Sequence, residues 1–120
     1  MSTNRNTNII KQLFETNCIK TGLFTLRNGE LSKYYFDMKN LVSYPELLKQ
    51  IGDKMYSLIQ DCDLLCGVPY GGLPICSYIS TKYNIPMIMP RQNLKNYGTK
   101  KQIEGTYKKT DRCVIIEDVI

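Results

Sequence analysis

Apolar residues recur at helical spacing twice in the first half of the chain. The first set is Ile9, Ile10, Leu13 and Phe14, and it predicts an amphipathic helix over roughly residues 7–17. The second set, which predicts a helix extending to about residue 60, is Leu47, Leu48, Ile51, Met55, Leu58 and Ile59. Just before it, Ser43 and Glu46 have the spacing of a capping box, and Pro45 suits a first helical turn. We therefore expect this second helix to begin at that point.

Between these helices the pattern favours two short strands, over residues 22–26 and 33–39. The connecting residues 27–30 contain Asn28-Gly29, a pair that is typical of tight hairpin turns. The sequence therefore predicts a small antiparallel hairpin.

The second half of the chain has continuous apolar runs instead of alternating ones. Residues 64–68, 85–89 and 114–116 form such runs, and residues 73–83 between the first two suit a helix. Continuous apolar strands are typical of a parallel sheet that is buried on both faces. We therefore expect one α/β domain over residues 1–120, with flanking helices, an N-terminal helix and short antiparallel strands.

Residues 91–112 have no clear period, and a segment of this length inside a small domain is usually disordered or functional. The net charge of the chain is +5, and residues 91–109 carry all of this excess, with six basic side chains against Glu104. A cationic loop of this kind suits a phosphate-rich substrate, although charge alone more often marks a solvated surface.

Other composition features bear on localisation and on metal sites. The five cysteines contain no C-x-x-C pair, and the absence of histidine excludes a zinc site with histidine ligands. We expect Cys66, Cys76 and Cys113 to pack as small apolar side chains in a reduced, cytoplasmic compartment. We predict no signal peptide and no membrane span, because no apolar run reaches the required twenty or so residues.

Three further segments are candidates for function, each with a simpler structural interpretation. Glu117-Asp118 follows an apolar strand and could accept hydrogen bonds from a ribose diol, although adjacent acids also occur as solvated strand ends. Residues 68–72 offer glycines and free amides for a phosphate, but the signal is weak when taken alone. Residues 34–37 could stack a planar heterocycle, although an aromatic strand more often belongs to a core.

Taken in order, these segments resemble orotate phosphoribosyltransferase, a type I phosphoribosyltransferase, and especially the form that is fused to a decarboxylase in UMP synthases. The matching blocks are Phe24–Gly29, Tyr35–Asp37, Val42–Pro45, Cys66–Tyr70, a loop block of Ile85–Met87, Pro90-Arg91, Lys95–Lys100 and Glu104–Thr106, and finally Ile115–Val119. Several blocks in the correct order are far more specific than any one of them.

The resemblance implies an enzyme of UMP biosynthesis that converts orotate and phosphoribosyl pyrophosphate to orotidine 5'-monophosphate and pyrophosphate. Mg²⁺ would be the cofactor, bound mainly through substrate, and the partner would be a second copy in a homodimer whose mobile loop reaches the neighbouring site. The implied catalytic residues are Lys95 and Asp118. The implied substrate-binding residues are Arg27, Tyr35, Phe36, Tyr70, Gly71, Arg91, Tyr97, Lys100, Glu117 and Asp118.

Departures from the family pattern leave an alternative open. Gln92 stands where the family commonly has a lysine, and Arg27 replaces another lysine. The family continues into a Thr-Ser-Gly loop that holds the ribose 5-phosphate, so we expect a truncated domain with its third strand exposed as an edge. The alternative is a non-catalytic protein of the same fold that binds nucleotide or pairs with a full-length subunit. A single-stranded nucleic-acid binder is a third hypothesis, and the ordered motifs argue against it.

Overall fold

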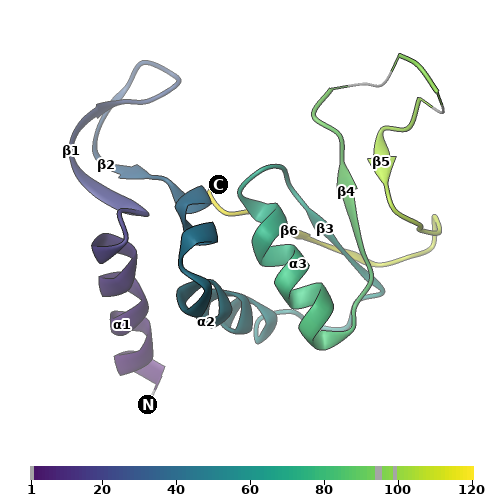
Figure 1. Cartoon of the computed structure of the whole chain (residues 1–120), viewed down its shortest axis with the longest axis horizontal. Helices are drawn as coiled ribbons and strands as arrows, with labels where there is room; N and C mark the ends of the chain where they lie inside the picture. Colours follow the sequence, from purple (N-terminus) through teal and green to yellow (C-terminus); the bar gives the residue numbers. More distant parts are fainter. Residues whose placement is uncertain (1, 94–95, 99) are drawn as a thin grey trace.

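The computed structural model describes residues 2–93, 96–98 and 100–120 (Figure 1). Its helices are α1 (Ser2–Glu15), the 3-10 helix η1 (Met38–Ser43), α2 (Pro45–Tyr56) and α3 (Gly72–Tyr83). Its strands are β1 (Ile19–Thr25), β2 (Leu31–Phe36), β3 (Leu64–Gly67), β4 (Met87–Pro90), β5 (Ile103–Glu104) and β6 (Cys113–Ile116). The order of elements agrees with the expected α/β fold.

The strands form two separate sheets. β1 and β2 make an antiparallel hairpin, closed by a turn in which the Leu26 amide donates to the Glu30 carbonyl at 2.8 Å. The larger sheet has the order β5-β4-β3-β6, with β3 parallel to both β4 and β6 and with β5 antiparallel to β4. Parallel pairing of these three strands brings their carboxyl ends to the same edge of the sheet.

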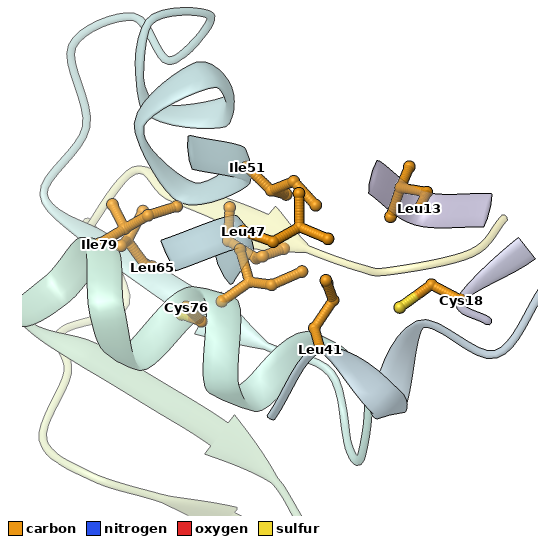
Figure 2. Packing of buried hydrophobic residues seen from close by; sticks show 10 residues of the cluster. Leu13, Cys18, Leu41, Leu47, Ile51, Leu65, Cys76 and Ile79 are labelled. Atoms are coloured by element: carbon orange, nitrogen blue, oxygen red, sulfur yellow. The ribbon is translucent and has the colours of Figure 1, made fainter. Parts of the chain in front are cut away.

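The core lies between the larger sheet and the helices α2 and α3, which pack against each other on one of its faces (Figure 1). Leu65 of β3 and Ile79 of α3 are completely buried there. Leu13, Cys18 and Leu41 extend the cluster toward the hairpin, as Figure 2 shows. These contacts anchor α1 and the base of the hairpin to the α/β layer.

The other face of the sheet is open along β6. Successive strand residues alternate between faces, and Ile115, between the core residues Val114 and Ile116, is 67% exposed. Within the described residues β6 pairs with β3 alone, so its outer edge carries no neighbouring strand. The exposed third strand that the sequence predicts is therefore present.

The chain is more extended than a compact domain of its size. Its radius of gyration is 16.3 Å, whereas about 14 Å is typical for this length. Figure 1 shows two projections that account for the difference, the β1–β2 hairpin on one side and the segment between β4 and β5 on the other. Both contain residues that the sequence singles out for function.

Several sequence-based boundaries were wrong. The capping box is absent, because Tyr44 is the residue before α2 and it makes no side-chain cap, while Ser43 ends η1. Pro45 does lie in the first turn of α2, which ends at Tyr56 and not near residue 60. Residues 91–112 contain the short strand β5, and Cys113, expected to be packed, is exposed. No helix in the described ranges is both long and apolar enough to span a bilayer.

Candidate functional site

Three of the predicted segments follow the carboxyl ends of the parallel strands. Tyr70 and Gly71 come after β3, Arg91 comes directly after β4, and Glu117 comes directly after β6. The Val68 amide donates to the Ile116 carbonyl at 3.0 Å, which ties the end of β3 to the end of β6. Ligands of open α/β sheets bind at this edge. The topology therefore gathers the candidate residues where a ligand is expected.

The turn from β3 into α3 packs closely against the end of β6. A β-carbon at Gly71 would overlap the Asp118 carboxylate, and one at Gly72 would lie 2.5 Å from the Ile116 carbonyl oxygen. Neither glycine has a positive φ, so close approach explains them, not backbone freedom. The weak glycine signal in the sequence thus has a physical basis, since the Asp118 carboxylate fits only against a residue without a side chain.

The two acids after β6 interact with each other. Glu117 Oε1 accepts a hydrogen bond from the Asp118 amide at 2.9 Å. The pKa of the Glu117 carboxyl is raised above its ordinary value, first by a hydrogen bond with the Asp118 side chain and second by partial burial. Two carboxylates held this close repel each other when both are ionised. Hydroxyl donors or a cation placed between them would relieve that repulsion.

A cavity of about 320 Å³ lies beside the β3–α3 turn. Its lining residues are Pro69, Tyr70, Leu73, Met89, Pro90, Arg91, Gln92, Asn93 and Glu104. This volume is at the lower end of the range for small-molecule sites. The cavity unites two of the predicted residues, Tyr70 and Arg91, and the peptide bond between Pro69 and Tyr70 is cis.

Arg91 is held by Glu104, a contact that the sequence analysis missed. Arg91 Nη1 donates to Glu104 Oε1 at 3.1 Å, and each side chain is about one-third exposed, 34% and 33%. The strands beneath them pair Met89 with Glu104, and the Arg91 amide donates to the Gln102 carbonyl at 2.8 Å. The available signal was that Glu104 is the one acidic residue in the basic segment 91–109.

The remaining loop residues lie farther along the projection between β4 and β5. Tyr97 is 68% exposed, and Lys100 is exposed and has a φ of 55°. The Lys100 amide donates to the Tyr97 carbonyl at 3.4 Å. Lys95, the predicted catalytic lysine, lies outside the described residues.

The predicted orotate-binding residues lie in the hairpin. Arg27 is exposed in its turn, and Tyr35 and Phe36 are 43% and 49% exposed on β2. Tyr35 packs against Phe24, with ring centroids 5.4 Å apart. Because Tyr35 and Phe36 are adjacent in a strand, their rings point to opposite faces and do not form one stacking surface. Figure 1 shows the hairpin and the β4–β5 projection on opposite sides of the chain.

Comparison with known proteins identifies the relatives of this chain, although no family model matches it. Orotate phosphoribosyltransferase of Methanocaldococcus jannaschii is 40% identical over 112 residues, covering 92% of this chain and 64% of that protein. Uridine 5'-monophosphate synthase of Bos taurus is 34% identical over 116 residues, covering 93% of this chain and 24% of that protein.

A solved structure agrees with the sequence relatives. UMP synthase of Leishmania donovani superposes with a TM-score of 0.80 at 37% identity, covering 90% of this chain and 24% of that one. This chain therefore spans between about a quarter and just under two thirds of the length of these relatives. The similarity extends over nearly all of the chain in both comparisons, and along that length the chain resembles orotate phosphoribosyltransferases and UMP synthases.

Proposed function

We propose that this chain provides an orotate phosphoribosyltransferase site, which joins orotate to the ribose of phosphoribosyl pyrophosphate in the biosynthesis of UMP. One observation carries the proposal: Gly71 is in close contact with Asp118 at the strand ends, and its neighbour Tyr70 lines the same cavity as Arg91. In a chain of this family, that arrangement offers carboxylates to a ribose and a cation to a phosphate at adjacent positions.

The described residues suit the charges of this reaction. As the bond to pyrophosphate breaks, positive charge develops on the ribose and negative charge on the leaving group. Glu117 and Asp118 would accept hydrogen bonds from the ribose hydroxyls, and Arg91 would bind a phosphate, since its planar fork of donors matches phosphate oxygens. Lys95 and Lys100 would supply further positive charge when the loop closes over the leaving group.

The hairpin would supply the orotate side of a site. Tyr35 and Phe36 offer exposed rings, and Arg27 offers a cation for the carboxylate or phosphate of a ligand. Because the hairpin and the loop lie on opposite sides of one chain (Figure 1), the loop of one copy would serve the site of a second. This separation supports a homodimer, and the free cysteines of the described residues support a reducing, cytoplasmic location.

Mg²⁺ would be held mainly through the substrate. The described residues contain no group of three or more potential metal-ligating His, Cys, Asp or Glu side chains. Glu117 and Asp118 offer two carboxylates, and one or two carboxylates together with substrate phosphates are a usual set for this ion. When bound there, Mg²⁺ would neutralise charge on the leaving pyrophosphate.

A spectroscopic assay tests the proposed function. The purified 120-residue protein is mixed with orotate, phosphoribosyl pyrophosphate and Mg²⁺, and the absorbance of orotate is followed. We expect the absorbance to fall, with the rate greatly reduced by Asp118→Ala and by Lys95→Ala. Lys49→Ala, on the exposed surface of α2, is the matched control and should leave the rate unchanged.

Two other outcomes separate the alternatives. Binding of phosphoribosyl pyrophosphate without turnover would favour a non-catalytic member of the family that binds its ligand or pairs with a full-length subunit. The proposal would be overturned if protein with the circular dichroism of a folded α/β domain showed neither binding nor turnover.

A further inference from the structure

The base of the β4–β5 projection is a short two-stranded ribbon with one ion pair across it. Met89 pairs with Glu104 and Pro90 pairs with Ile103, so the backbone on both sides of the loop is fixed by strand pairing. Arg91 and Glu104 join their side chains across this ribbon at 3.1 Å. Both side chains border the same cavity. The ion pair is therefore part of the cavity wall.

The guanidinium of Arg91 keeps donors available for a ligand. Within the described part of the chain, its side-chain contact is the single bond from Nη1 to Glu104. An arginine side chain has five N–H donors in a planar fork, so Nη2 and Nε remain for the oxygens of a phosphate. A long, flexible side chain loses rotamer freedom when it binds, and an arginine that is already held loses less.

We propose that Glu104 is a positioning residue, which holds the Arg91 guanidinium against the cavity so that its free donors bind the diphosphate group of a ligand. The proposal rests on the proposed function, because it concerns the phosphate-binding role given to Arg91. Two features support it. Partial burial strengthens the ion pair relative to a fully exposed one, and the strand pairing of Glu104 fixes the anchor from which it acts.

The opposite role for Glu104 makes a different prediction. A carboxylate that competed with the ligand for Arg91 would weaken binding, and its removal would strengthen it. A positioning carboxylate strengthens binding, and its removal weakens it. The sign of the change in affinity therefore decides between the two roles.

Titration calorimetry with inorganic pyrophosphate and Mg²⁺ measures this sign on the whole 120-residue chain. We expect Glu104→Ala to weaken binding about tenfold, a usual size for coupling between contacting residues. Glu104→Gln keeps the length and an acceptor oxygen, and it should retain part of the affinity. Glu46→Ala, which removes the exposed Lys49–Glu46 pair on α2, is the matched control and should bind like the wild type.

A double-mutant cycle separates positioning from a general structural effect. Arg91→Ala should weaken binding, and adding Glu104→Ala to it should cause no further loss, because Glu104 acts through Arg91. In the turnover assay, Glu104→Ala alone should raise KM for phosphoribosyl pyrophosphate more than it lowers kcat. If Glu104→Ala fails to fold, Glu104→Gln carries the comparison.

The outcomes distinguish the two proposals. Wild-type protein that binds no pyrophosphate would overturn the proposed function and the role of Glu104 together. If the wild type binds pyrophosphate, and Glu104→Ala and Glu104→Gln bind it equally well or more tightly, only the positioning role of Glu104 would be overturned. A further loss of affinity when Glu104→Ala is added to Arg91→Ala would also overturn it, because Glu104 would then act independently of Arg91.

Discussion

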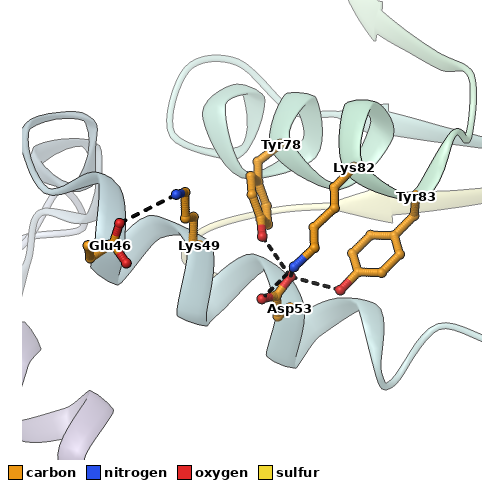
Figure 3. Close-up of polar contacts among 6 residues, drawn as sticks. All are labelled: Glu46, Lys49, Asp53, Tyr78, Lys82 and Tyr83. Carbon is orange, nitrogen blue, oxygen red and sulfur yellow. Dashed lines mark hydrogen bonds and ion pairs between the residues drawn. The ribbon is translucent and has the colours of Figure 1, made fainter.

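Two ion pairs in this chain have the same charges but very different surroundings. In the first, the Asp53 carboxylate of α2 accepts hydrogen bonds from Lys82 Nζ at 2.8 and 3.0 Å, from the Tyr78 hydroxyl at 2.8 Å and from the Tyr83 hydroxyl at 2.8 Å (Figure 3). The Tyr83 ring also stacks on Tyr56, with centroids 3.5 Å apart. We call Asp53 and its three donors the Asp53 cluster.

The second pair, Arg91 with Glu104, has one hydrogen bond among the residues that the structure describes, and both residues line a cavity. In the Asp53 cluster each hydrogen bond to the Asp53 carboxylate joins α2 to α3, and the acceptor oxygens are occupied by the chain's own donors. In the second pair, Arg91 lines a cavity of ligand size, and its guanidinium has donors beyond the one that bonds to Glu104. The difference teaches that a saturated pair fixes helices together, whereas an unsaturated pair at a cavity can bind a ligand.

The largest effect on this comparison should come from Gly52→Ala in α2. A β-carbon at Gly52 would overlap the Tyr78 ring, so the ring must move and its hydroxyl must leave Asp53. We expect the free energy of unfolding to fall by about 1–3 kcal/mol, the usual cost of overpacking. Urea denaturation measures it, and Lys54→Ala, on the exposed side of α2, should stay within about 0.5 kcal/mol of the wild type. If Gly52→Ala unfolds at the same urea concentration as the wild type, the Asp53 cluster does not hold α2 and α3 together.

The next effect separates the cations of the two pairs. Arg91→Met should weaken pyrophosphate binding about tenfold, because a ligand-facing cation is lost, and should change stability by less than about 0.5 kcal/mol. Lys82→Met should do the reverse, lowering the melting temperature without changing pyrophosphate affinity. Calorimetric titration and thermal denaturation of both variants make the test. Similar profiles for the two variants would remove the distinction between a structural and a ligand-binding pair.

The order of the elements was predictable from the sequence because it depends on local apolar patterns. The continuous run 64–68 and the helical spacing of residues 47–59 are properties of neighbouring residues, and both produced the expected elements. The Ser43 capping box failed because η1 ends at Ser43 and Tyr44 takes the position before α2. A spacing rule does not detect a competing local conformation.

The location of the candidate site was predictable only where a motif ends a strand. Glu117 and Asp118 follow an apolar run, so the strand-end rule for α/β sheets located them. The contact of Gly71 with Asp118, and the pairing of Arg91 with Glu104, join residues that are far apart along the chain. No local pattern encodes such contacts. They arise from the parallel pairing of β3 with β6 and from the antiparallel pairing of β5 with β4.

A smaller effect should appear in the pH dependence of stability at the Asp53 cluster. The hydrogen bond from Lys82 is the main cause that lowers the pKa of Asp53 below its ordinary value of 3.8, and the two tyrosine hydroxyls add to it, against the opposing effect of burial. A lowered pKa in the folded protein stabilises it above pH 3.8, and this stabilisation is lost as the pH falls through the folded pKa.

Asp53→Asn removes this contribution. We expect it to lower stability at pH 7 by about 1 kcal/mol, since the cluster is partly exposed and solvent screens it. Urea denaturation at pH 7 and near pH 3 should show the difference from the wild type shrinking in acid. A difference that stays constant between these two pH values would mean that the charge of Asp53 does not contribute.

The smallest effect should come from Glu117→Gln, and it should have the opposite sign. Within the described residues Glu117 forms no ion pair with a cation, unlike Asp53, and its neighbour Asp118 and partial burial raise its pKa above the ordinary 4.5. When the pKa of a carboxyl is raised in the folded protein, its ionisation destabilises the fold. The protonated carboxyl of Glu117 therefore contributes its full stability below pH 4.5, and this contribution is lost as the pH rises through the folded pKa. Glutamine keeps an oxygen for the Asp118 amide but carries no charge.

We therefore expect Glu117→Gln to be more stable than the wild type at pH 7, by no more than about 0.5 kcal/mol, and equal to it below pH 4. Urea denaturation across this pH range measures the difference. Saturating Mg²⁺ with phosphoribosyl pyrophosphate should reverse the order at pH 7, because a ligand that uses the ionised carboxylate stabilises only the wild type. If Glu117→Gln without ligand is less stable than the wild type without ligand at pH 7, the two acids do not repel each other. The strand end would then resemble the saturated Asp53 cluster and not an unfilled binding site.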